Sequence, residues 1–335
     1  MKNYLYYTGI DVSKKTLDYC VVNAVSSEVV LQEKTENSVK GMDSMLCRMK
    51  AEKINLDELF FCFENTGVYS APLSFFLSQR RKDYVEVAAL EIKKSKGITR
   101  GKNDTTDARD IAFYGLRNRD KLELSRIPSK EIITLKVLLS EREKTVEAIK
   151  SFSMSKENVG FLPDEVSLLW IEGNHKMIKQ LKEYLSELDI KIETIITGSL
   201  ELNTQKELLM SIPGIGKTIA VYMIIATRGF TSFKNSRKFA CYAGVAPFEY
   251  SSGTSIRGRT KVSPFADKKM KSLLHMAALN AIRCDAELKT YYERKKMEGK
   301  HTLLILNNVK CKLIGRAFAV INRKSEFVNI YKFSA

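Results

Sequence analysis

The sequence has 335 residues, 44% hydrophobic and 28% charged, which is long enough for two domains with separate cores. Its longest apolar run, Ile219–Ala226, is far shorter than the ~20 residues of a membrane helix, and residues 1–5 show no export signal. We therefore expect a cytoplasmic protein with no membrane partner.

The cysteine and histidine content argues against a thiolate or imidazole metal site. Six cysteines are dispersed without a C-x-x-C pair, and the chain has three histidines. The cysteines are expected to be buried free thiols in a reducing compartment.

Positive charge is concentrated towards the C-terminal end. Residues 205–335 contain 24 Lys and Arg against 8 Asp and Glu, whereas residues 1–204 contain 31 of each kind. Such asymmetry predicts a polyanionic partner, because basic side chains gain affinity by releasing counterions from phosphates. The alternative is a soluble surface that is merely basic.

The first third of the chain predicts an α/β domain. β-Branched and aromatic residues indicate consecutive strands over 5–10, 17–22 and 29–31. Apolar runs and periodicity then predict a helix over about 38–53, strand 59–63, a helix over about 69–81, strand 84–89 and a helix from 104. A β-meander followed by alternating helices and strands is the order of the ribonuclease-H-like fold, so we predict an RNase-H/RuvC-like domain over residues 1–128.

Residues 129–203 predict a helical coiled-coil linker, with two antiparallel helices separated near Gly160 and Pro163. Apolar positions in the second helix step by three and four, with Asn174 in the one skipped place: Ile171, Ile178, Leu181, Leu185, Leu188, Ile192 and Ile195. This heptad favours a coiled coil, whose polar seam residue can set the oligomeric state. The alternative is an amphipathic helix packed on its own domain.

Four carboxylates are candidate metal ligands. Asp11 and Glu64 each follow an apolar strand, where a carboxylate can face a cleft and bind an oxygen-preferring cation. Asp104 and Asp107 are three residues apart, so a helix places both on one face. Two metal ions held there could flank a scissile phosphate. The alternative for Asp104 is a helix N-cap with an acidic residue in the first turn.

Two basic segments are candidate nucleic-acid contacts. Residues 93–102 carry five cations and no acid, among them Lys94, Lys96, Arg100 and Lys102, and predict a loop that guides a strand or contacts RNA. Residues 211–218 resemble a helix-hairpin-helix turn, whose backbone N–H groups approach DNA phosphates and which includes the candidate contact Lys217, although a plain helix-packing turn fits too. The segment is not a Walker A loop, because Ser211 stands where the first glycine is required.

Residues 204–335 predict a basic, mainly helical domain with a candidate nucleophile. Its turn over 251–255 concentrates hydroxyls beside Arg257, Arg259 and Lys261, which could hold a developing anion. The residues alone do not choose among the hydroxyls of Ser251, Ser252, Thr254 and Ser255. The alternative is a flexible polar turn that only binds backbone phosphates.

Five motifs in order resemble one family, the insertion-sequence transposases with an N-terminal RuvC-like DEDD domain and a C-terminal serine-bearing domain, also described as bridge-RNA-guided recombinases. The motifs are G-I-D-V-S-K-x-x-L-D from Gly9, E-x-T-G-x-Y from Glu64, K-N-D-T-x-D-A-R from Lys102, S-I-P-G-I-G from Ser211, and A-G-V-A-P followed by Y-x-S-G-x-S-I-R-G. The resemblance covers nearly the whole chain.

The resemblance implies that Asp11, Glu64, Asp104 and Asp107 form a tetrad binding Mg²⁺ (or Mn²⁺), and that Ser252, directly before Gly253, is the nucleophile. It also implies cleavage and rejoining of donor and target DNA through a transient serine–DNA link. The expected partners are a non-coding bridge RNA and further copies of the chain, as a dimer or tetramer with composite active sites, near the bacterial nucleoid.

Three rival functions remain. The first is a RuvC-like nuclease that uses metal-activated water, and the second is a non-catalytic nucleic-acid-binding protein. The third is a sugar kinase of the actin-like fold, which also opens with a G-I-D turn. The kinase predicts a late adenosine-binding glycine motif, which the sequence lacks, and no basic C-terminal region.

Overall fold

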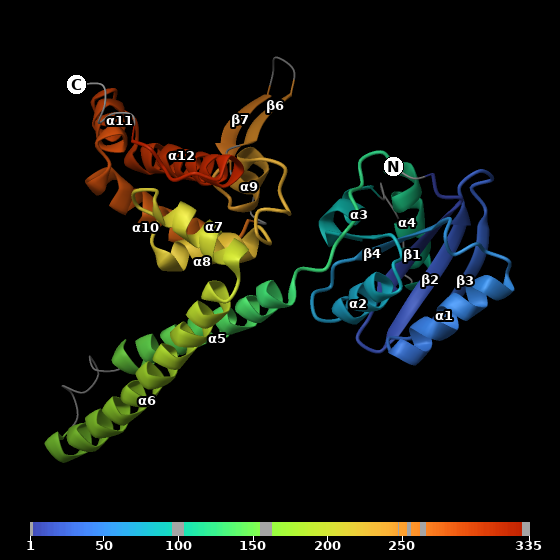
Figure 1. Ribbon diagram of the computed structural model, residues 1–335, viewed down its shortest axis with the longest axis horizontal. Coiled ribbons are helices and arrows are strands. Elements are labelled where there is room, and N and C mark those ends of the chain that lie inside the picture. Colours follow the sequence, from blue (N-terminus) through green and yellow to red (C-terminus); the bar gives the residue numbers. More distant parts are fainter. Residues whose placement is uncertain are drawn as a thin grey trace. The chain divides into compact units, whose positions relative to one another are not determined.

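The computed structural model describes residues 3–95, 104–154, 163–246, 248–252, 256–261 and 266–329, with backbone alone at 90, 93, 94, 104, 105, 154, 248–252 and 256–261. The chain divides into two compact units, Met1–Ile127 and Pro128–Ala335. Each unit is described separately (Figure 1).

The first unit is built on a five-stranded mixed sheet with the order β3-β2-β1-β4-β5. The strands are β1 (Tyr6–Val12), β2 (Thr16–Asn23), β3 (Val29–Glu36), β4 (Leu59–Glu64) and β5 (Tyr84–Val87). The meander β1-β2-β3 is antiparallel, whereas β4 pairs in parallel with both β1 and β5. The predicted α/β order is confirmed.

Helices cover both faces of this sheet (Figure 1). On one face α1 (Val39–Ala51) and α2 (Ala71–Gln79) pack against alternate residues of the strands, such as Ile10 and Phe61. On the other face α3 (Ala89–Ser95) and α4 (Asp104–Arg117) pack against the intervening residues, such as Tyr7 and Cys62. This division follows from the two-residue period of strands.

Two predictions for the first unit were wrong in detail. Residues 89–95 form α3, not the end of a strand and the start of a basic loop. Strand β3 continues to Glu36, five residues beyond the predicted end, and of its eight residues only Leu31 is buried. Its polar residues gave no alternating apolar signal because β3 is an edge strand.

The second unit is mainly helical. It contains α5 (Lys130–Met154), α6 (Asp164–Thr197), α7 (Leu200–Met210), α8 (Lys217–Ala226), α9 (Ser236–Tyr242), β6 (Phe248–Ser252), β7 (Ile256–Lys261), α10 (Lys268–Cys284), α11 (Ala286–Met297) and α12 (Thr302–Arg323). Side-chain caps at Ser199, Asn235, Asp267 and Asp285 each accept a hydrogen bond from the backbone near a helix start, which fixes where these helices begin.

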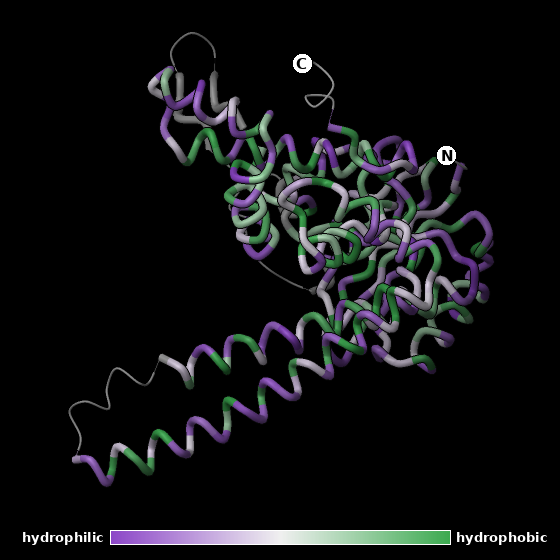
Figure 2. The backbone as a smooth tube through the Cα atoms, turned by 60° about the vertical axis from the view of Figure 1, so that its left-hand side comes forward, coloured by the Kyte–Doolittle hydropathy of each residue, from purple (hydrophilic) through white to green (hydrophobic). Residues whose placement is uncertain are grey.

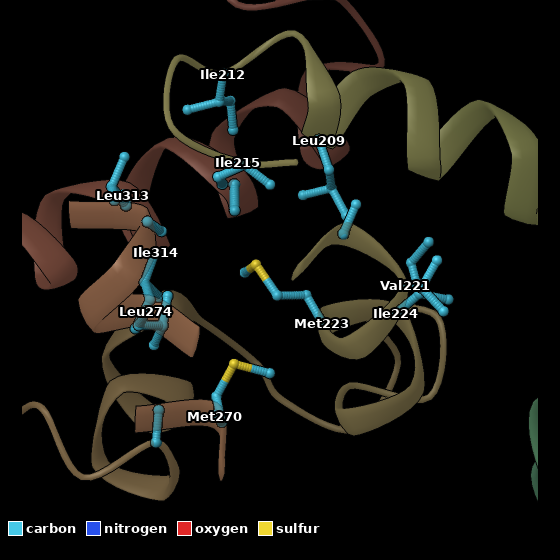
Figure 3. Packing of buried hydrophobic residues seen from close by; sticks show 14 of the residues in the cluster. Leu209, Ile212, Ile215, Val221, Met223, Ile224, Met270, Leu274, Leu313 and Ile314 are labelled. Atoms are coloured by element: carbon cyan, nitrogen blue, oxygen red, sulfur yellow. The ribbon is translucent and has the colours of Figure 1, made fainter. Parts of the chain in front are cut away.

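One hydrophobic core joins α7 to α12 with the adjoining parts of α5 and α6. In Figure 3 the side chains of Met223 on α8 and Met270 on α10 lie among Leu209 on α7, Ile215 in the turn before α8, and Leu274 on α10. Gly214 belongs to this packing. Its φ is +96°, and a Cβ there would lie 2.7 Å from the Ala277 carbonyl oxygen on α10, so no larger residue fits.

Helices α5 and α6 lie side by side as an antiparallel hairpin, with polar and apolar positions alternating along both (Figures 1 and 2). The predicted heptad positions of α6 are buried or half-buried and are flanked by exposed residues, as a seam requires. Arg142 on α5 donates to Asp189 on α6 at 2.7 Å. The seam is therefore covered by a helix of the same chain, and a role in assembly stays a prediction.

None of the described helices combines the length and apolar character that crossing a bilayer requires. All six cysteines are free. Cys20 and Cys62 are buried as predicted, but Cys47 and Cys284 are exposed, so the expectation that all six are buried was wrong. Exposure of these two follows from their places on the outward faces of amphipathic helices.

Candidate functional site

Asp11 and Glu64 lie beside one another at the carboxyl ends of two neighbouring parallel strands. The register pairs Gly9 with Cys62 and Ile10 with Phe63, so Asp11 and Glu64 are the next pair. Both are half-buried. Because side chains alternate along a strand, both share the face of Gly9 and Cys62, which α3 and α4 cover.

Helix α4 is seated on this face through Gly9. A Cβ at Gly9 would lie 2.1 Å from the Ala112 nitrogen and 2.2 Å from the Ala108 carbonyl oxygen, so the helix backbone rests directly on the strand. Further along α4, a Cβ at Gly115 would lie 3.6 Å from the Tyr7 ring. Helix α4 therefore runs opposite to β1, and its first turn lies at the strand end that carries Asp11.

The first turn of α4 contains Asp104 and Asp107, the other two predicted metal ligands. Asp107 is half-buried, and the side chain of Asp104 is not among those described. Among the described side chains, no group of three or more His, Cys, Asp and Glu is close enough to hold a metal ion. The fold thus brings the four positions to one end of the sheet, while the tetrad itself stays a prediction.

Asp18 is a further carboxylate beside this site, and its position was not predicted from the sequence. It pairs with Asp11 across β1 and β2, which puts both on the same face. Asp18 is 7% exposed, and its Oδ2 lies 3.0 Å from Lys34 Nζ on the neighbouring strand. Lys34 compensates the buried charge, so Asp18 is a structural neighbour of the candidate ligands.

The loops around this strand end are held by side-chain hydrogen bonds. After Glu64, Asn65 Oδ1 accepts from the Gly67 backbone at 3.0 Å, and Gly67 has a φ of +71°, which favours glycine. Asn37 Nδ2 donates to the carbonyl oxygens of Ser13 and Tyr69, at 2.9 and 3.0 Å. The backbone flanking Asp11 and Glu64 is therefore tied to the end of β3.

Ser252 is the last residue of strand β6, in a short antiparallel hairpin. Ser252 pairs with Ile256 and Ser251 with Arg257, with a register shift between Phe248 and Tyr250. The predicted turn over 251–255 was wrong in this respect, because Ser251 and Ser252 belong to a strand. Arg257, Arg259 and Lys261 lie on β7, and their side chains, like that of Ser252, fall outside the described atoms.

Lys217 is the first residue of α8, after the predicted helix-hairpin-helix turn. Its Nζ lies 3.0 Å from Glu193 Oε2, and Lys206 Nζ donates to Glu193 Oε1 at 2.6 Å. These two lysines, Lys206 first, hold the pKa of Glu193 below its ordinary value. Gly216 caps α8, and a Cβ there would meet no atom within 4 Å.

The predicted basic loop is only partly described. Lys94 lies in the last turn of α3, so the first part of the segment is helical, and its side chain is outside the described atoms. Lys96, Arg100 and Lys102 all lie outside the described residues.

Two family profiles match the chain. The DEDD profile, described as "Transposase", matches residues 8–155, and the profile described as "Transposase IS116/IS110/IS902 family" matches residues 206–293. Together they span both units and include every predicted site residue. The fold and these matches define the protein as a DNA transposase or recombinase.

The chain belongs to the IS110/IS116/IS902 transposase family. It is 27% identical to pilin gene-inverting proteins of Moraxella bovis and Moraxella lacunata over 326 residues, which is 96% of this chain and 97% of each relative. It is 33% identical over 116 residues to an insertion element IS110 protein of Streptomyces coelicolor, covering 34% of this chain and 28% of that protein. The family implies DNA substrates and a divalent metal ion.

Proposed function

We propose that this protein cuts and rejoins DNA with an acidic metal site at Asp11, Glu64, Asp104 and Asp107 and with Ser252 as nucleophile. One observation carries the first part. Adjacent parallel strands β1 and β4 carry carboxylates at their carboxyl ends, and α4, seated on Gly9, begins at the same end of the sheet with the other two. Three segments of the chain, separated by 53 and 40 positions in sequence, would thereby contribute to one site.

The sheet supports a ribonuclease-H/RuvC-like fold for the first unit. A three-stranded antiparallel meander is extended by two parallel strands, with helices on both faces. In such sheets ligands bind at the carboxyl ends of the parallel strands, which is where Asp11 and Glu64 lie.

The donor set fits Mg²⁺ or Mn²⁺, because carboxylate oxygens are the ligands that these cations prefer. The cation would neutralise charge on the scissile phosphate and polarise its oxygens. Asp11 and Glu64 would hold it from the sheet, and Asp104 and Asp107 from the helix. Asp18 would remain paired with Lys34, outside the ligand set.

Ser252 would act by direct displacement. Its Oγ gives up its proton and forms a bond to phosphorus while the bond from phosphorus to one deoxyribose oxygen breaks, and that oxygen takes up a proton, so the step involves no net gain or loss of protons. Rejoining reverses these steps with a different strand, so the phosphodiester count is conserved. Arg257, Arg259 and Lys261 on the paired strand would hold the phosphate oxygens, and Lys94, Lys96, Arg100, Lys102 and Lys217 would contact the nucleic-acid backbone.

We further propose that a bridge RNA selects donor and target DNA, and that the acidic unit of one copy meets the serine unit of another in a homo-oligomer. The family resemblance of the sequence supports both parts. The names of the relatives include insertion elements and pilin gene inversion, so the reaction on DNA can be insertion or inversion of a segment.

The decisive experiment traps the covalent intermediate. With donor DNA, its RNA and Mg²⁺, the wild-type protein should form a protein–DNA adduct that Ser252→Ala abolishes and Ser251→Ala retains. Glu64→Gln and Asp104→Asn should abolish cleavage. An adduct that survives in Ser252→Ala removes Ser252 as nucleophile, and cleavage without any adduct favours the water-dependent nuclease. Undiminished recombination in Glu64→Gln or Asp104→Asn refutes the metal site and favours a nucleic-acid-binding protein.

A further inference from the structure

Lys310 on α12 is a buried lysine without a described partner. Four charged residues are buried among those described: Asp18, Lys206, Asp285 and Lys310. The first three have partners of opposite charge, namely Lys34, Glu193 and Arg316. Lys310 is 6% exposed and has no ion pair or hydrogen bond with any described side chain. An uncompensated buried charge is costly, so we expect a negative partner for Lys310 that is not among the described side chains.

Lys310 lies beside the segment that leads into the serine hairpin. On the same part of α12, Asn307 Nδ2 donates to the Val245 carbonyl oxygen at 2.5 Å, and Cys311 Sγ lies 3.5 Å from that oxygen. Val245 precedes the start of β6 by three residues. Helix α12 therefore contacts the backbone that leads into the hairpin, within one helical turn of Lys310.

Helix α10 places two more basic residues at the same place. Lys271 packs against Gly244, since a Cβ there would lie 3.7 Å from Lys271 Cδ. Burial and the charge of Lys271 lower the pKa of Lys310, and burial and the charge of Lys310 lower the pKa of His275. No described carboxylate contributes to either shift. Burial first, and then the neighbouring positive charge, therefore disfavour the charged form of each group.

We propose that Lys310, Lys271 and His275 form a phosphate-binding site at the base of the serine hairpin, which holds a backbone phosphate of the DNA strand. Nearness to β6 favours DNA as occupant, and this part rests on the proposed role of Ser252. A phosphate there would supply the missing negative charge and fix the strand beside the hairpin. The internal rival is Glu249, the one acid in residues 247–265, whose side chain is not among those described.

The first test compares two buried lysines in the full-length Ser252→Ala protein. Lys310→Met replaces an uncompensated charge by an apolar chain of similar length, so the Tm should stay the same or rise. Lys206→Met is the matched control, and it should lower the Tm because it strips Glu193 of its nearest partner. Binding of a labelled DNA duplex should weaken in Lys310→Met, and the logarithmic salt slope should fall by about one.

The second test reads the site directly by NMR of His275, which is one of three histidines in the chain. Adding the duplex to the Ser252→Ala protein should raise the pKa of His275, and Lys310→Met should remove most of this response. Both measurements use a protein that lacks the Ser252 hydroxyl. Their outcome therefore does not depend on whether Ser252 is the nucleophile.

Three results would overturn the proposal. Lys310→Met could lower the Tm as Lys206→Met does while DNA leaves His275 unchanged, which makes Lys310 structural. Glu249→Gln could lower the pKa of His275 in the free protein, which makes Glu249 the internal partner. Single-stranded RNA could raise the pKa of His275 where duplex DNA does not, which assigns the phosphate to a guide strand.

Discussion

At the scale of single residues, the proposed metal site depends on Gly9, because this residue has no side chain. Gly9 lets the backbone of α4 rest on β1, and this contact brings the first turn of α4, with positions 104 and 107, to the end of the sheet that carries Asp11 and Glu64. The helix residues that face Gly9, Ala108 and Ala112, are also small and fully buried. Any side chain at residue 9 would have to lift α4 off the strand, because the opposing atoms belong to the helix backbone.

Gly9→Ala should therefore destabilise the first unit by at least about 3 kcal/mol, at the upper end of overpacking effects, and should abolish DNA cleavage. Denaturant unfolding and a cleavage assay measure the two effects. Gly173→Ala is the control, because no atom lies within 4 Å of a Cβ there, and it should stabilise exposed α6 by about 0.5–1 kcal/mol. Normal cleavage by Gly9→Ala would show that this contact does not align the carboxylates.

The positions of Asp11 and Glu64 near the carboxyl ends of two strands could be predicted from the sequence, because each is a carboxylate that follows an apolar run. Gly9, Asp18 and Lys310 could not be assigned a role in this way. Their surroundings depend on strand register and on helices distant in sequence, and Lys310 looks like any other lysine of a helix. The choice of Ser252 over Ser251 came from family resemblance alone, since strand pairing does not distinguish the two.

At the scale of elements, α6 contacts three other helices of the second unit, namely α5, α7 and α8. Its apolar stripe packs on α5, and near its C-terminal end Glu193 reaches Lys206 on α7 and Lys217 on α8. Lys206 is 8% exposed, so its charge depends on Glu193 for compensation.

Glu193→Gln should destabilise the second unit by about 1–3 kcal/mol at pH 7, because it leaves Lys206 buried with a weaker partner. The pKa of Glu193 in the folded protein lies below its ordinary value of 4.5, so its contribution is complete above pH 4.5. The contribution should disappear as the pH falls through the folded pKa, where wild type and variant converge. Glu187→Gln on the exposed face of α6 should match wild type at every pH in chemical denaturation.

The order of elements was predictable wherever a segment carried its own pattern. The apolar run of β4 and the heptad of α6 are examples. The heptad could not show which helix packs against α6, because its apolar pattern is the same for a seam that faces α5 and for one that faces a second copy of the chain. The β6–β7 hairpin was missed because its hydroxyl and cationic residues lack apolar alternation, and α3 because seven residues are too few for a helical period.

At the scale of the whole molecule, the two units have separate hydrophobic clusters among the described residues. The excess positive charge, evident from the sequence, lies in the second unit, whereas the predicted acidic ligands all lie in the first. The proposed metal site and most of the positive charge that would attract DNA therefore belong to different units.

We expect two thermal transitions in calorimetry, one for each unit. Gly9→Ala should lower the Tm of one transition, and Leu188→Ala, which truncates a side chain that is 2% exposed on α6, should lower the other by removing about 2–5 kcal/mol. Magnesium should raise only the transition that Gly9→Ala affects, by mass action on the native form. A single transition that both substitutions shift would show that the units unfold as one.

The ion pair between Lys217 and Glu193 should affect the binding of nucleic acid to Lys217. A phosphate that bound Lys217, as proposed above, would compete with Glu193 for this cation, and therefore with the α6–α8 junction. Coupling of this kind is reciprocal. A change that moves Glu193 on α6 away from Lys217 should therefore strengthen the binding of nucleic acid to Lys217 by the same free energy. The position of the α5–α6 hairpin and the affinity of Lys217 for nucleic acid should therefore be thermodynamically coupled.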